Sequence, residues 1–176
     1  STSCSLLHVP YTVENETKLE DKYKKHFAFT KEKLNLGTQW IQFDEPYLVH
    51  DLTANDLRLF QDLYSAILNK KEKTKILSQT YFGDVRDIYT VLQTLNFDGI
   101  GLDFVEGRKT LALVKEHGFS PVKKLFAGVV NGKNIWKNNY KKTLSILNSL
   151  KEKEIQTVVS TSCSLLHVPY TVENET

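Results

Sequence analysis

The chain has 176 residues, of which 40% are hydrophobic and 25% are charged, and this composition is typical of a single globular domain with one sizeable core. Its 23 basic and 21 acidic side chains leave a net charge of +2, so we expect no concentrated basic face for nucleic acid. No apolar run approaches the roughly 20 residues of a membrane span and no signal peptide opens the chain, so neither a membrane nor secretion is expected.

Strand and helix patterns alternate along the chain. Short apolar or β-branched runs predict strands at residues 2–7, 40–44, 75–82, 99–105, 124–130 and 158–166. Apolar residues at steps of three and four predict helices at residues 17–35, 52–69, 85–95, 109–118 and 139–153. Apolar strands separated by helical crossovers are typical of a parallel sheet covered by helices, so the predicted fold class is α/β in one domain, residues 1–176.

The first seventeen residues, STSCSLLHVPYTVENET, recur letter for letter as residues 160–176. Natural repeats diverge, and architectural repeats have shorter periods, so we interpret the duplication as recent or engineered. Cys4 and Cys163 are the same position in the two copies, which excludes a disulfide framework and favours a reducing cytoplasm. Only one copy can fill a given place in a sheet.

The spare copy has a consequence for assembly. An unpaired apolar strand leaves an exposed edge that can pair with another chain. We therefore expect a homo-oligomer formed by strand exchange. Six predicted strands, two of them identical, are too few for a closed barrel of eight, so either the sheet stays open or another chain completes it.

Candidate site residues lie where strands end, because chemistry in parallel α/β folds gathers at the carboxyl ends of the strands. The candidates for substrate binding are Asp44, Glu45, Asp103, Cys163 and His167. Each has a structural alternative. The carboxylates can cap loops, a free thiol among apolar neighbours usually behaves as a small buried hydrophobe, and a lone histidine beside a proline is usually a surface residue. No catalytic residue and no metal ligand set is predicted.

Several segments closely resemble the later half of the amino-terminal barrel of cobalamin-independent methionine synthase. They are WIQFDEP at residues 40–46, TYF at 80–82, GVVNGKNIW at 128–136, STSCSLLHVP at 160–169 and TVENETKLEDKYKKHFAFTKEKL at 12–34. The resemblance covers essentially the whole chain and implies part of a (βα)8 barrel of the TIM type. It also implies a role in transferring a methyl group from polyglutamylated methyltetrahydrofolate to homocysteine, a reaction in which the family uses zinc.

The zinc ligands of that family belong to its carboxy-terminal barrel, and the resemblance places them here on Ser78, Thr80, Asp103 and Cys163, or on Cys4 in the other copy. Two hydroxyls, one carboxylate and one thiol are not a tetrahedral set of nitrogen and sulfur ligands. We therefore expect no zinc and no other cofactor in this chain. The DEP motif resembles a segment whose acidic residue contacts the amine of homocysteine in the catalytic barrel.

The order of the segments departs from that of the family. One copy of the final strand, with its helix, precedes the DEP strand, and the strands that come before the DEP strand in the family are missing. The junction lies near residues 35–37. Two hypotheses follow: a catalytically silent, rearranged or engineered barrel fragment, or a remnant that contributes folate or homocysteine contacts to the zinc-dependent methyltransferase.

Overall fold

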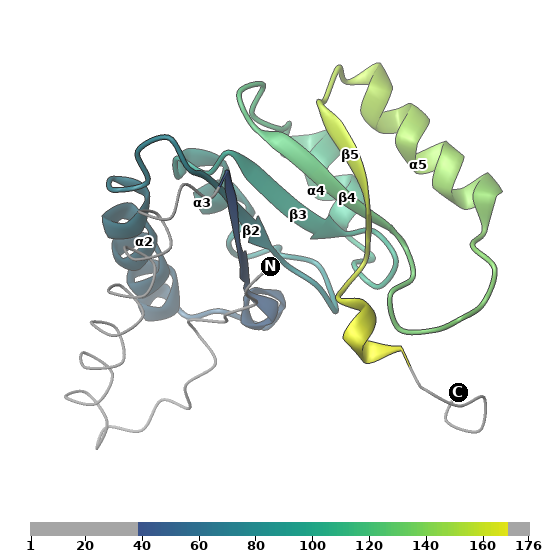
Figure 1. Ribbon diagram of the computed structural model, residues 1–176, viewed down its shortest axis with the longest axis horizontal. Helices are drawn as coiled ribbons and strands as arrows, with labels where there is room; N and C mark the ends of the chain where they lie inside the picture. The colour runs from purple at the N-terminus through teal and green to yellow at the C-terminus, as the bar shows by residue number, and fades with distance from the viewer. Residues whose placement is uncertain (1–38, 169–176) are drawn as a thin grey trace.

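The computed structural model describes residues 39–168 (Figure 1). The predicted strand at residues 2–7, the predicted helix at 17–35, and with them Cys4 and His8 of the first copy, lie outside the described residues. So does the end of the second copy, beyond Val168.

Five parallel strands form one sheet in the order in which they occur along the chain. They are β1 (Trp40–Asp44), β2 (Lys75–Gln79), β3 (Gly99–Asp103), β4 (Lys124–Val130) and β5 (Thr157–Thr161). This order confirms the predicted α/β fold with helical crossovers and is consistent with part of a TIM-type barrel. Within the described residues the sheet is not closed.

Four α-helices connect the strands: α2 (Ala54–Leu68), α3 (Tyr89–Thr94), α4 (Thr110–His117) and α5 (Tyr140–Glu152). Helix α2 begins at a capping box, in which the Thr53 hydroxyl accepts from the Asp56 N–H while the Asp56 carboxylate accepts from the Thr53 N–H. Helix α4 ends at Gly118, whose φ of 72° lies in the region that glycine adopts without strain.

The strand ends are shorter than predicted. The runs at 75–82, 99–105 and 158–166 stop pairing at Gln79, Asp103 and Thr161. Beyond β5 the chain turns into the 3-10 helix η3 (Leu165–His167), where the Ser164 hydroxyl accepts from the Leu166 N–H. Another 3-10 helix, η2 (Pro46–Val49), follows β1, and the helix predicted at 85–95 begins only at Tyr89.

The hydrophobic core lies between the sheet and the helices. Ile76, Ile100 and Leu125 from three neighbouring strands are fully buried in it. The α2 ring of Tyr64 packs against Phe43 of β1, with centroids 5.7 Å apart, and against Phe97, at 5.1 Å. These contacts hold α2 against the sheet and thereby fix the carboxyl end of β1.

Glycines on the other face of β3 make room for larger neighbours. A Cβ at Gly99 would lie 2.8 Å from the ring of Phe126, and one at Gly101 would lie 2.0 Å from the side chain of Gln79. Phe126 in turn meets Trp40 edge-on at 5.8 Å. The rings of β1 and β4 can therefore meet across the glycines of β3.

Gly128 is the position where the β4–β5 pairing is most sensitive to substitution. A Cβ there would lie 2.8 Å from the backbone Cα of Ser162 and 3.0 Å from the carbonyl oxygens of Leu102 and Thr161. Because only backbone movement can relieve these contacts, Gly128→Ala should lower the free energy of unfolding by about 1–3 kcal/mol. Urea unfolding followed by circular dichroism measures the change.

The matched control is Asn148→Ala on the exposed surface of α5, which should change stability by less than about 0.5 kcal/mol. Equal urea midpoints for wild type and Gly128→Ala would show that β5 does not pack against β4 as described.

Candidate functional site

The two acidic residues of the DEP motif are buried and project to different sides of β1. Asp44 accepts a hydrogen bond from the Gln42 amide at 2.6 Å, so it shares the face of Gln42. Glu45 accepts from the hydroxyl of Tyr64 at 2.5 Å, and that tyrosine packs on the helix-covered side against Phe43. The two carboxylates therefore do not act as a pair at one site.

Asp103 ends β3 and binds three backbone N–H groups. Its Oδ1 accepts from Val105 at 2.7 Å and from Glu106 at 2.9 Å, and its Oδ2 accepts from Phe82 at 3.0 Å. The side chain is buried, and burial raises its pKa, although the three N–H bonds favour the charged form and oppose that shift. Asp103 thus joins the loop after β2 to the loop after β3, which agrees with the loop-capping interpretation.

Phe82 has an uncommon backbone conformation. Its φ of 74° is rare for a bulky side chain, and the bond from its N–H to Asp103 holds the backbone there. Its ring lies 4.7 Å from that of Tyr81 and 5.0 Å from that of His167. The histidine was predicted to stand alone at the surface. It is exposed, but its ring packs edge-on against Phe82.

Cys163 and Tyr81 are buried at the carboxyl ends of β5 and β2. Burial is the main cause that raises the pKa of the Cys163 thiol, and Asp103 and Glu106 add to it. A thiol that stays protonated in an apolar site is inert, as expected for a small buried hydrophobe. Burial also raises the pKa of Tyr81 to about 12, with smaller contributions from Asp44, Cys163 and Glu45.

These residues lie at the carboxyl ends of the strands, with Glu45 on the helix-covered side of β1, and we call them the strand-end cluster: Asp44, Glu45, Tyr81, Phe82, Asp103, Cys163 and His167. Tyr81 and Phe82 connect the five predicted residues, and sequence reasoning did not select them as site residues. A second missed feature is the ion pair between the Lys133 ammonium and the Glu106 carboxylate, at 2.9 Å. The same ammonium lies 4.8 Å from the centre of the Phe82 ring. The signal was their position at a strand end: Tyr81 and Phe82 close the predicted strand at 75–82, in TYF, and Lys133 follows the predicted strand at 124–130, in GVVNGKNIW.

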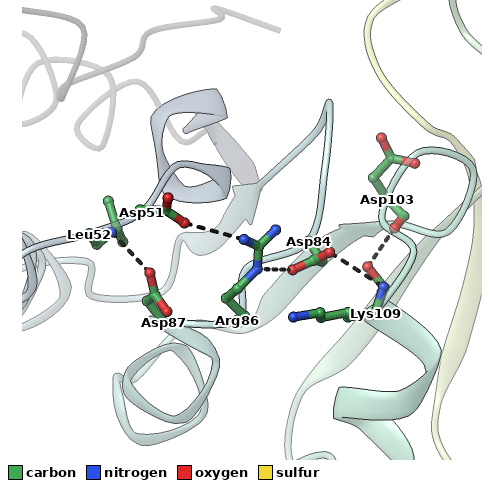
Figure 2. A network of polar contacts seen from close by, with 8 residues as sticks. Asp51, Leu52, Asp84, Arg86, Asp87, Asp103 and Lys109 are labelled. Atoms are coloured by element: carbon green, nitrogen blue, oxygen red, sulfur yellow. Dashed lines mark hydrogen bonds and ion pairs between the residues drawn. The ribbon is translucent and has the colours of Figure 1, made fainter.

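A chain of polar contacts ties the loops at this edge together (Figure 2). The Arg86 guanidinium donates to Asp84 at 2.7 Å and to Asp51 at 3.3 Å. The other oxygen of Asp84 accepts from the Lys109 N–H, so three successive strand-to-helix loops are connected. The pKa of Asp84 is lowered: burial would raise it, but the bonds to Arg86 and Lys109 together outweigh that effect.

The four positions that match the zinc ligands of the catalytic barrel do not form a zinc site. The Thr80 hydroxyl donates to the Gly101 carbonyl at 2.7 Å, and Asp103 is occupied by three N–H groups. Ser78 offers only a neutral hydroxyl, and a single thiol remains. Among residues 39–168, no three His, Cys, Asp or Glu side chains are grouped so that they could hold a metal ion.

Residues 9–155 match the family described as the N-terminal domain of cobalamin-independent synthase. The chain is 52% identical over 161 residues to the 5-methyltetrahydropteroyltriglutamate–homocysteine methyltransferase of Lactococcus lactis subsp. lactis strain IL1403, covering 92% of this chain and 21% of that protein. It is 51% identical over 145 residues to the enzyme of that name from Campylobacter jejuni subsp. doylei, covering 82% of this chain and 19% of the relative. The chain thus spans about a fifth of the length of these curated relatives. None of the helices in the described part is long and apolar enough to cross a membrane.

The raised pKa of Tyr81 tests the strand-end cluster. Because its folded pKa of about 12 lies above the unfolded value of 10.0, its contribution to stability is complete below pH 10 and is lost as the pH rises through 12. In ultraviolet titrations, the difference between wild type and Tyr81→Phe should have its midpoint near pH 12.

Asp44→Asn should lower that midpoint, because it removes one of the charges that disfavour the phenolate. A wild-type difference curve centred near pH 10, or one that Asp44→Asn leaves unchanged, would show that Tyr81 does not lie in this cluster.

Proposed function

Since the chain belongs to the family of the N-terminal domain of cobalamin-independent synthase, we propose that it serves methionine synthesis as a barrel portion that does not itself transfer methyl groups. The relatives are named for methyl transfer between 5-methyltetrahydropteroyltriglutamate and homocysteine, and the chain corresponds to only about a fifth of them. We call this the supporting role: the chain supplies part of the barrel structure and does not carry out the reaction.

The hydrogen bonding of Asp103 is the observation that supports a silent role. A metal-binding carboxylate must offer an oxygen lone pair to the ion, and its other partners usually orient it from outside the site. Both oxygens of Asp103 instead accept backbone N–H groups from two loops. These three bonds take up most of the acceptor capacity of the carboxylate, which supports a role in shaping the edge of the sheet.

The alternative role is a binding contribution to folate or homocysteine. It is favoured by Asp44, a buried carboxylate at the end of β1 that lies close enough to Tyr81 to influence its pKa. A buried carboxylate attracts an amine, but the bond from Gln42 already occupies one oxygen. We therefore rank the supporting role first.

A zinc competition assay tests the silent role. We expect the purified chain to bind no zinc at micromolar concentration, because neutral hydroxyls stand where nitrogen and sulfur ligands are needed. We also expect no methionine from homocysteine and methyltetrahydrofolate triglutamate with zinc added. Stoichiometric zinc binding that Cys163→Ser abolishes, or zinc-dependent turnover, would contradict the proposal.

Titration of the chain with homocysteine alone, followed by nuclear magnetic resonance, separates the two roles. Saturable shifts at β1 that Asp44→Asn removes would favour the binding role. If homocysteine causes no saturable shifts at β1 and the chain binds no zinc, the supporting role is favoured.

We further propose that chains assemble through the duplicated segment. The last copy supplies Ser160 and Thr161 of β5 and the turn after it, where the Gly132 N–H donates to the Ser162 hydroxyl at 3.1 Å. Only this copy directly follows residues 157–159, which pair with residues 125–127 of β4. Because those residues already hold it beside β4, it pairs in the sheet of its own chain in preference to the first copy. The first copy lies outside the described residues, and we propose that it pairs with a second chain. Val159 of β5 is 56% exposed, so an apolar surface is available for a second chain.

Light scattering coupled to size exclusion tests this assembly. Wild type should show a mass above that of one chain that rises with concentration, because exchange between chains follows mass action. Deleting residues 1–17 should return the mass to that of a monomer without loss of helix signal. A wild-type monomer at every concentration would contradict strand exchange.

A further inference from the structure

A groove beside the first turn of α5 is separate from the strand-end cluster. The cavity has a volume of about 580 Å³ and lies between the loop after β3 and helix α5. A smaller cavity of about 210 Å³ adjoins it and shares the wall formed by Phe104, Val105, Asn139, Lys142 and Ile146. We call the two together the α5 groove. Its combined size is that of a site for a small organic molecule.

The charge of the groove has one sign. Arg108, Lys141 and Lys142 line the larger cavity, and Lys137 lines the smaller. No aspartate or glutamate lines either cavity, and none of the four cations forms an ion pair with another described residue. Cations gathered around one concave surface attract an anion, since nothing in the groove neutralises them.

The backbone of α5 adds to this preference. The Asn139 side chain caps the helix by accepting from the Lys142 N–H, while the N–H groups of Tyr140 and Lys141 have no partner among the described residues. N–H groups of a first helical turn, together with the helix dipole, favour negative charge at this end. The helix has 13 residues, so its dipole is well developed.

The remaining lining is apolar. Phe104, Leu111 and Ile146 form part of the larger cavity, and Trp136, 60% exposed, lines the smaller one. A free inorganic ion would leave this surface in contact with water. A ligand that carries an apolar group would cover it and would gain free energy in proportion to the area buried.

We propose that the α5 groove binds a small organic anion, in which a phosphate or carboxylate group is joined to an apolar or aromatic body. The anionic group meets Arg108, Lys141 and Lys142 at the start of α5, and the body lies on Phe104, Ile146 and the neighbouring Trp136. The site is independent of the proposed supporting role, because it uses none of the residues of the strand-end cluster.

The test is a nuclear magnetic resonance titration of the full chain with phenyl phosphate and, separately, phenylacetate. We expect saturable shifts at Arg108 and residues 140–143, and the tighter of the two probes identifies phosphate or carboxylate as the preferred group. The double variant Lys141→Gln/Lys142→Gln should weaken binding about tenfold or more, because it removes two of the three cations that meet the anionic group.

The matched control is Lys151→Gln/Lys153→Gln, which removes the same charge at the other end of the helix, about 15 Å away at 1.5 Å per residue. It should leave the affinity unchanged. Equal weakening by both double variants would show attraction by net charge alone and would overturn the proposal. Inorganic phosphate binding as tightly as phenyl phosphate, or shifts elsewhere than at the groove, would overturn it too.

Discussion

The carboxylate of Asp103 is the constraint on which the edge of this sheet depends. One side chain accepts N–H groups from Phe82, Val105 and Glu106, so two loops that are distant in sequence share a single anchor. The left-handed backbone of Phe82 persists because that anchor holds it, and the ring of Phe82 then positions Tyr81 and His167. Without the carboxylate, three partly buried backbone donors would lose their partner, a cost that proteins rarely accept.

The same position shows how a carboxylate that matches a zinc ligand of the carboxy-terminal barrel serves the hydrogen bonding of this sheet. The resemblance places a metal-binding acid where Asp103 stands, and a carboxylate can hold a metal or organise loops but cannot do both with the same lone pairs. Here Thr80 and Asp103 bond to backbone groups of neighbouring strands and loops. Within the described residues, both positions take part in the hydrogen bonding of the sheet and its loops.

Local pattern predicted the elements well and their ends poorly. The strand at residues 40–44 and the helix at 52–69 follow from short-range sequence, and the structure confirms both, the helix as Ala54–Leu68. The ends of β2 and β3 were placed too late, because bonds to Asp103 turn the chain before its apolar pattern stops: a long-range one from Phe82 after β2 and a local one from Val105 after β3. The contact of His167 with Phe82, and the groove between Arg108 and Lys141, join residues that are far apart in sequence and had no local signal.

The strand order has a consequence for how such a chain can be rebuilt. Each strand of the sheet pairs only with the strands that precede and follow it in sequence, and each crossover stays on its own pair. A chain wired in this way can be cut in any strand-to-helix unit and rejoined elsewhere, and every pairing that remains keeps its partner and its direction. A strand with its helix can also be added or removed at either edge of the sheet without changing the pairing of the other strands. A sheet with this strand order can therefore accept an added segment at its end, such as the copy of residues 1–17 that stands at residues 160–176.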